Sequence, residues 1–176
     1  MGARVIVGVS GSLASLAALR RAVHEARARA AELVVVHAYA AARGGKPATV
    51  AAVSDSRLRL ARRRLAACIE QGLGGLPTDL VVREALLEGV AAGPALVTQV
   101  RGGDDLIVVG ATGRRGPGLG WRRVGDYCGK HATCAVLTVP TPELARVLAR
   151  GSKGRLREIH RQLAEDLRAD ADLSGF

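Results

Sequence analysis

Five short apolar runs, rich in valine, isoleucine and leucine, recur along the chain. They occupy residues 5–9, 33–39, 79–85, 105–111 and 135–140. Most of them are continuous rather than alternating, which is typical of strands that are buried on both faces of a parallel sheet. The pattern therefore predicts five strands of one sheet.

Stretches with helical periodicity separate these runs. From Leu16, apolar residues recur at steps of three and four up to residue 30, and Ser12 is well placed as the N-cap of this helix. A third helix is expected to begin near Pro94, a residue that suits the first helical position, and a fourth to cover about residues 121–132. The second helix has an apolar stripe formed by Leu58, Ala61, Leu65, Cys68 and Gly72. Its opposite face is basic and consists of Arg57, Arg59, Arg62, Arg63 and Arg64.

Alternating strands and helices predict an α/β domain with right-handed crossovers. In such sheets ligands bind beyond the carboxyl ends of the strands, where the strand order reverses. The candidate binding loops are therefore the "VSGS" that follows the first strand and the "GATGRRGPGLG" that follows the fourth. The pattern alone leaves the strand order open.

Residues 141–176 follow the fifth strand and predict a helical C-terminal extension. Thr141 and Pro142 suit a helix start, and a "GSKG" break divides the extension into two amphipathic segments. The apolar stripe of the second segment is Leu156, Ile159, Leu163 and Leu167. Two interpretations stay open: the helix packs on its own domain, or it contacts a protein partner.

The net charge of +10 points either to a polyanionic partner or to an arginine-rich codon bias. Only 3 of the 26 basic residues are lysine, and they and the arginines are spread along the chain. With few aromatic residues and no known reading motif, we expect no specific nucleic-acid binding. The chain also has no apolar run of membrane-spanning length and no signal-peptide pattern, so a cytoplasmic location is expected.

No cluster of residues predicts catalysis or a metal site. The three cysteines form no CxxC pair, and the HExxH and GxSxG motifs are absent from the sequence. Cys68 and Cys134 are expected in the core, whereas Cys128 could be either buried or reactive. His37 is expected to be a strand-end histidine with a hydrogen-bond partner, although it could also face a pocket.

Four segments resemble a universal stress protein of the type found in actinobacteria. They read "VIVGVSGSLASLAALRRAVHEA", "LVVVHAY", "DLIVVGATGRRG" and "DYCGKHATCAVLTVP", and they span about residues 3–140 in the order typical of the family. The resemblance implies a Rossmann-like five-stranded parallel sheet of order 3-2-1-4-5 with helices on both faces. It also implies a homodimer joined along the fifth strand. Residues 1–140 would form this domain, and 141–176 an extension to it.

In its ATP-binding branch, the family carries G-x2-G-x9-G-[ST] after the fourth strand and an acidic residue after the first. This chain keeps the G-x2-G part, but arginines occupy the later Gly-[ST] pair after eight residues instead of nine, and Ser10 replaces the acid. By this resemblance the nucleotide site comprises Val9, Ser10, Ala38, Gly110, Thr112, Gly113, Arg122, Arg123 and Val124.

Three interpretations of the arginine pair stay open. Arg122 and Arg123 could bind phosphate by charge, fill the phosphate site, or be solvated surface residues. The leading functional hypothesis is a regulatory stress-response protein with a weakened or altered pocket for ATP or a related adenine nucleotide. The alternatives are a dimeric interaction module without nucleotide binding, acting through its basic surface or C-terminal helices, and an ATP-hydrolysing or self-phosphorylating enzyme.

Overall fold

A computed structural model describes residues 2–41, 47–111 and 124–142 of the chain. The chain divides into two units, Met1–Thr141 and Pro142–Phe176, and the described ranges belong almost entirely to the first. The helical extension expected after residue 140 therefore lies outside the described residues and stays a prediction.

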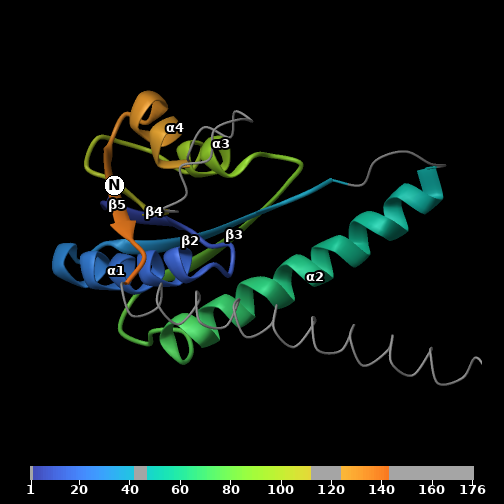
Figure 1. The fold of residues 1–176 in the computed structure, drawn as a ribbon, viewed down its shortest axis with the longest axis horizontal. Coiled ribbons are helices and arrows are strands. Elements are labelled where there is room, and N and C mark those ends of the chain that lie inside the picture. The colour runs from blue at the N-terminus through green and yellow to red at the C-terminus, as the bar shows by residue number, and fades with distance from the viewer. Residues whose placement is uncertain (1, 42–46, 112–123, 143–176) are drawn as a thin grey trace, which may run out of the picture. The chain divides into compact units, whose positions relative to one another are not determined.

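Five parallel strands form one sheet of order β3-β2-β1-β4-β5 (Figure 1). Ile6 lies opposite Val34 of one neighbouring strand and Ile107 of the other, so β1 is central. The strand order and the all-parallel arrangement confirm the fold class that the resemblance implied. The strands are β1 (Arg4–Gly8), β2 (Glu32–Tyr39), β3 (Val82–Glu88), β4 (Leu106–Ala111) and β5 (Ala135–Pro140).

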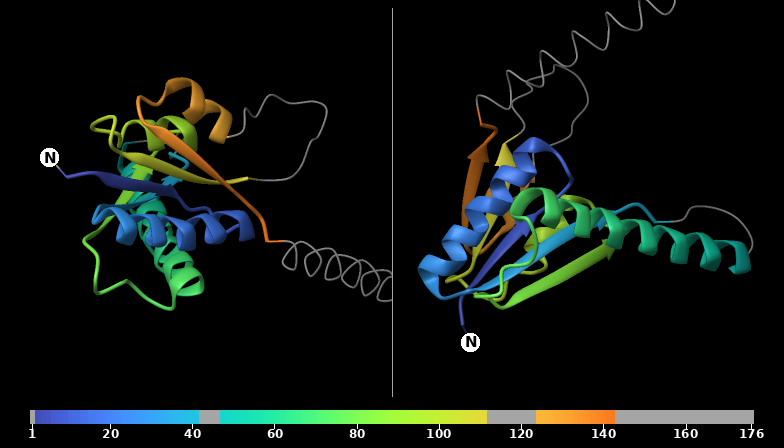
Figure 2. Two further views of the ribbon diagram at one scale, coloured as in Figure 1. Left: turned by 90° about the vertical axis from the view of Figure 1, so that its left-hand side faces the viewer. Right: turned by 90° about the horizontal axis from the view of Figure 1, so that it is seen from below.

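The helices cover both faces of the sheet (Figures 1 and 2). On one face lie α1 (Leu13–Arg29) and α2 (Pro47–Leu73), and on the other lie α3 (Ala92–Val97) and α4 (Val124–His131). The first turns of α2 extend beyond the end of the sheet, as Figure 1 and the right-hand view of Figure 2 show.

Successive side chains of the central strands point to opposite faces of the sheet and so fill two separate cores. Val5 and Val7 of β1 point toward α1 and α2, whereas Ile6 between them packs in the cluster that includes α3 and α4. All three side chains are fully buried. The burial of each such side chain contributes about 1.5–3 kcal/mol to the stability of the folded protein. Two covered faces explain why the strands read as continuous apolar runs.

Helix α1 begins as its sequence predicts. The Ser12 hydroxyl accepts a hydrogen bond from the amide of Ser15 at 3.2 Å, which satisfies one of the free N–H groups of the first turn. At the other end, Ala30 adopts a left-handed conformation with φ 47°, and its amide donates to carbonyls of the last turn.

The contact between α1 and α2 depends on Gly72. A Cβ atom at this glycine would lie 2.9 Å from Leu19 Cδ2, so the absence of a side chain lets the helices approach closely. Arg20 of α1 then donates from Nε to the Gly72 carbonyl at 2.8 Å. The predicted apolar stripe is confirmed, because Ala61, Leu65 and Cys68 are buried.

Two element boundaries differ from the expectation. The third strand begins at Val82, not at residue 79, because Asp79 forms a 2.7 Å ion pair with Arg27 of α1 and so stands outside the sheet. Helix α3 begins at Ala92, which makes Pro94 its third residue, and its N-cap Ala91 has no side-chain hydrogen bond that the sequence could reveal.

A buried ion pair joins the amino ends of β1 and β4. Arg4 donates from its amide to Asp105 Oδ1 at 2.9 Å and from its guanidinium to Oδ2 at 3.1 Å. Burial opposes ionisation of Asp105, yet hydrogen bonds from the Arg101 amide and from Arg4 outweigh it and hold the pKa of this carboxyl below its usual range. This end of the sheet is the one opposite to the predicted binding loops.

Candidate functional site

A hollow of about 230 Å³ lies at the carboxyl ends of β1 and β4. These two strands are neighbours at the centre of the sheet, and the strands that follow each of them lie on opposite sides. The hollow therefore occupies the point where the strand order reverses, as expected for a ligand site in a sheet of this type. Apolar side chains of Val36, Ala38, Leu96 and Val109 contribute to its walls.

Gly110 is required by packing at the edge of this hollow. A Cβ atom there would lie 2.4 Å from the Ala14 carbonyl oxygen and 2.8 Å from the Ser15 amide nitrogen. The end of β4 thus touches the backbone of the first turn of α1. The glycine that the resemblance assigned to phosphate approach already has a structural reason, independent of any ligand.

Three serines border the hollow, Ser10 and Ser12 from the loop between β1 and α1 and Ser15 from the first turn of α1. The Ser10 hydroxyl donates to Ser12 Oγ at 3.1 Å, and the Ser10 amide donates to Ser15 Oγ at 3.2 Å. Gly11 allows this tight turn with φ +79°, a conformation that residues with a Cβ rarely adopt. The hydroxyls are therefore held in fixed positions before any ligand arrives.

His37 supports the same wall from β2. Its Nδ1 donates to the Val9 carbonyl oxygen at 2.9 Å, while the Val9 amide donates to the Val36 carbonyl oxygen at 2.9 Å. The ring is buried. The expectation of a strand-end histidine with a partner is confirmed, and its role is to hold the backbone of a residue that lines the hollow.

The start of α4 closes the hollow on the side of β5. Val124, Gly125 and Asp126 line it together with Thr138 of β5. A Cβ atom on Gly125 would lie 3.3 Å from Val109 Cγ2 and 3.4 Å from Thr138 Oγ1, so this turn packs closely on both strands.

Five of the nine residues predicted for the nucleotide site line this one hollow: Val9, Ser10, Ala38, Gly110 and Val124. They come from the loop after β1, from β2, from β4 and from α4. The other four, Thr112, Gly113, Arg122 and Arg123, lie outside the described residues. That these residues bind nucleotide stays a prediction.

Sequence reasoning missed several polar residues of the hollow, notably Asp126 and Thr138. Among the described lining residues, Asp126 is the only charged one. Its position was a signal in the sequence, because Asp126 lies two residues after the predicted Val124, in the same first turn of α4.

The cysteines offer no reactive thiol at this site. Cys128 is fully buried in α4, and burial raises its pKa to about 11. Burial also raises the pKa of Cys68 and that of Cys134, which packs partly buried against the same cluster as Cys128. The interpretation of Cys128 as a reactive thiol is therefore wrong, because the thiolate form that reacts is strongly disfavoured.

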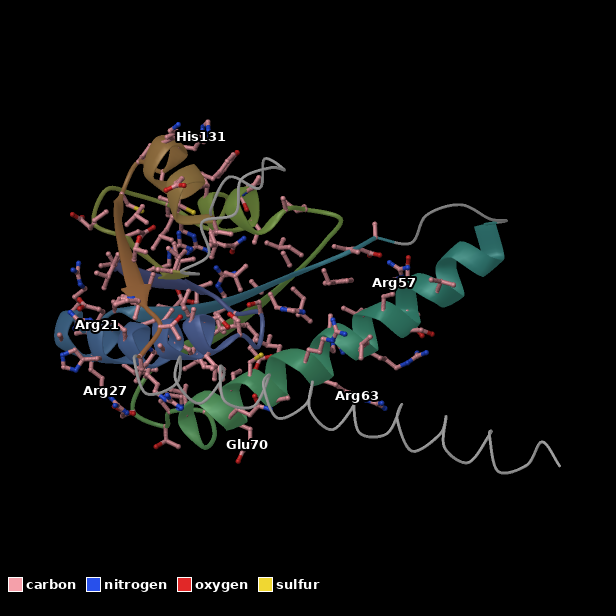
Figure 3. The ribbon with its side chains drawn as sticks, viewed as in Figure 1. Arg21, Arg27, Arg57, Arg63, Glu70 and His131 are labelled. Atoms are coloured by element: carbon pink, nitrogen blue, oxygen red, sulfur yellow. The ribbon has the colours of Figure 1, made fainter. Side chains whose placement is uncertain are left out.

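The basic face of α2 lies away from the hollow. Figure 3 shows Arg57 and Arg63 at different points along this helix, and Arg21 and Arg27 on α1. Part of this basic face already has partners within the protein. Arg59 forms an ion pair with Asp55 of the same helix, and Arg57 donates hydrogen bonds to the carbonyls of Ala40 and Ala41.

Ranges 2–41, 47–111 and 124–142 contain neither a candidate membrane span nor a candidate metal site. None of the helices there is both long enough and apolar enough to cross a membrane. Nor do three His, Cys, Asp or Glu side chains gather there in a group that could hold a metal ion.

Known proteins resemble this chain in sequence and in fold. The structure of UspA from Lactobacillus plantarum is 21% identical, covers 78% of this chain and 97% of that one, and superposes with a TM-score of 0.56. A universal stress protein family structure from Burkholderia pseudomallei is 20% identical, with coverage of 78% and 96% and a TM-score of 0.50.

A universal stress protein solved in complex with cAMP is 28% identical, with coverage of 80% and 98% and a TM-score of 0.47. The comparison with curated proteins found no match. The sequence profile of the Universal stress protein family matches residues 1–140, which is most of the 176-residue chain. The chain therefore belongs to the universal stress protein family.

Proposed function

We propose that this protein is a regulatory stress-response protein that binds an adenine nucleotide weakly in the hollow beside β1 and β4. One observation carries the proposal. Residues that are far apart in sequence and were assigned to the nucleotide by motif position, from Val9 to Val124, line a single hollow at the strand reversal.

The walls suit a heterocyclic base. Val36, Ala38 and Leu96 supply apolar surface, and hydroxyls of Ser10 and Thr138 supply hydrogen-bonding groups at the rim. Ligand sites in proteins combine a mostly apolar lining with a few polar groups in this way. Binding, rather than turnover, fits this composition, because the serine hydroxyls are engaged with one another and no histidine or lysine stands among the described lining residues to activate them.

Affinity is expected to be low for two reasons. Ser10 gives the loop after β1 no charge, and arginines replace the small residues at positions 122 and 123. Losing two hydrogen bonds to charged groups, each worth about 1.5–3 kcal/mol, would lower affinity by roughly two to four decades. An arginine at phosphate would recover part of this loss through charge.

Calorimetric titration of the full chain with ATP, AMP and adenosine tests the proposal. We expect measurable but weak binding of at least one of them. Guanosine serves as the control for recognition of the base and should bind less well. If no adenine compound binds at millimolar concentration, and protein released by denaturation carries no nucleotide, the proposal is wrong.

That result would favour the second candidate, a dimeric interaction module without a nucleotide. The observation behind it is the position of β5 at the edge of the sheet, with Ala135 and Thr138 exposed. An unpaired edge strand is a surface that proteins usually protect, and a second copy would do so. We propose a cytoplasmic homodimer joined along β5, with a partner protein bound through the C-terminal extension.

A further inference from the structure

We infer that Asp126 binds the ribose hydroxyls of the ligand and so makes the hollow select ribonucleosides over their deoxy forms. The inference rests on the proposed function, because it assigns a role in the same hollow. The loop after β1 has Ser10 in place of an acidic residue, and in this inference Asp126 of α4 supplies the carboxylate instead.

Close packing of the neighbours of Asp126 fixes its place. Gly125 lies against Val109 and Thr138, with no room for a larger residue without a shift. Tyr127 packs on α3, since a Cβ atom on Gly93 would lie 2.7 Å from the tyrosine Cδ1. The next residue, Cys128, is fully buried. Gly125 and Tyr127 are thus partly buried and Cys128 fully so, and Asp126 is the exposed residue among these four, with a place in the lining of the hollow.

The carboxylate has capacity for a ligand. Among the described residues it has no hydrogen-bond or ion-pair partner, and none of the described lining residues carries a positive charge. An ionised carboxylate only accepts hydrogen bonds, so its partner must offer donors. The two vicinal hydroxyls of a ribose offer two donors to the two oxygens of one carboxylate.

The surroundings favour a sugar over a phosphate at this position. The N-terminus of a helix attracts anions, but in α4 the side chain of Asp126 already supplies a negative charge to the first turn. A phosphate placed there would be repelled by that charge. The other polar groups nearby, Ser10, Ser12 and Thr138, are neutral hydroxyls that match a sugar rim.

The experiment titrates the full chain, and its Asp126→Ala and Asp126→Asn variants, with adenosine, 2′-deoxyadenosine and 3′-deoxyadenosine. For the parent we expect each deoxy compound to bind about tenfold to a hundredfold more weakly than adenosine, the range for one hydrogen bond to a charged group. In Asp126→Ala the three compounds should bind within about twofold of one another, at the level of the deoxy compounds. Asp126→Asn should keep part of the preference, because the amide oxygen still accepts.

Asp104→Ala is the matched control, since Asp104 is also exposed and precedes β4 at the opposite end of the sheet. It removes the same charge and should leave the preference intact. Equal binding of ribose and deoxyribose forms by the parent, or an undiminished preference in Asp126→Ala, overturns the role of Asp126 while leaving nucleotide binding in place. Failure of all three nucleosides to bind the parent overturns both the proposed function and this inference.

Discussion

The carbonyl oxygen of Ala14 lies where a side chain on Gly110 would have to begin, 2.4 Å from the position of its Cβ. This contact joins the first turn of α1 to the end of β4, and both of these segments contribute residues to the lining of the hollow. A glycine in a binding motif can be needed for close approach of a ligand or for packing within the protein, and at Gly110 the packing requirement is present without a ligand.

Gly110→Ala should destabilise the ligand-free protein. The added methyl group meets backbone atoms, which cannot rotate away as a side chain can, so a loss of about 1–3 kcal/mol or more is expected for overpacking. Urea unfolding without nucleotide measures it. Gly129→Ala is the control, because a Cβ atom there meets nothing within 4 Å. Equal stability of the two variants would show that Gly110 serves only the ligand.

Asp105→Asn should lower the free energy of unfolding by about 3–5 kcal/mol at pH 7, because it leaves the buried Arg4 guanidinium without its counter-charge. The pKa of Asp105 is lowered in the folded protein, so its contribution is complete above the unfolded value of about 3.9 and is lost as pH falls through the lower folded value. Urea unfolding between pH 7 and pH 2 should show a parent curve that falls toward the curve of the variant. Asp104→Asn, an exposed neighbour, should leave the profile unchanged, and a parent and variant separated equally at all pH values would contradict the assignment.

Replacing Arg122 and Arg123 together by alanine should weaken ATP binding and flatten its salt dependence, because two cations near the phosphates would be lost. Calorimetry at two salt concentrations measures both effects. The control removes two charges from the exposed face of α2, as Arg63→Ala with Arg64→Ala. Unchanged or tighter ATP binding by the first variant would mean that the arginines obstruct the site.

A homodimer should be found by light scattering at micromolar protein concentration. Ala135→Lys should shift it toward monomer, because a charge on an exposed edge residue opposes pairing of β5 with a second copy. Val81→Lys, beside the opposite edge strand β3, adds the same charge at an exposed residue and should not. Dimers that survive in the first variant and dissociate in the second would place the contact at the other edge.

Cys128 should resist alkylation in the folded protein. With its pKa raised to about 11, only about one thiol in a thousand is ionised at pH 8, and the side chain is fully buried. A variant with Cys68→Ser and Cys134→Ser isolates this thiol for a colorimetric thiol assay. Reaction should be slow until denaturant is added. Rapid labelling of the native variant would contradict the burial of α4 against α3.

Much of the fold was predictable because it depends on local pattern. The apolar runs of β1 and β2 are continuous since residues such as Val5 and Ile6 face different, equally covered sides of the sheet. Ser12 was recognisable as a cap because the interaction spans only three residues. The start of β3 was not, since it depends on the pairing of Asp79 with Arg27, 52 residues away.

The candidate site was predictable only in part. Val9 and Ala38 are unremarkable aliphatic residues, and family resemblance rather than their chemistry assigned them to the site. Asp126 was missed because periodicity cannot tell which residue of a helical turn faces a hollow. That depends on Tyr127 meeting Gly93 and on Gly125 meeting Thr138, contacts that exist only in the folded chain.

The hydrogen bond from His37 to Val9 has a consequence for the imidazole itself. A carbonyl oxygen can only accept, so Nδ1 must carry the hydrogen, and the neutral ring exists as the Nδ1–H tautomer with its lone pair on Nε2. The contact therefore needs a donor at position 37. A replacement side chain supports the Val9 backbone in the same way only if it places an N–H or O–H group at the position of Nδ1, and an ionised carboxylate there would face the carbonyl oxygen with a second acceptor.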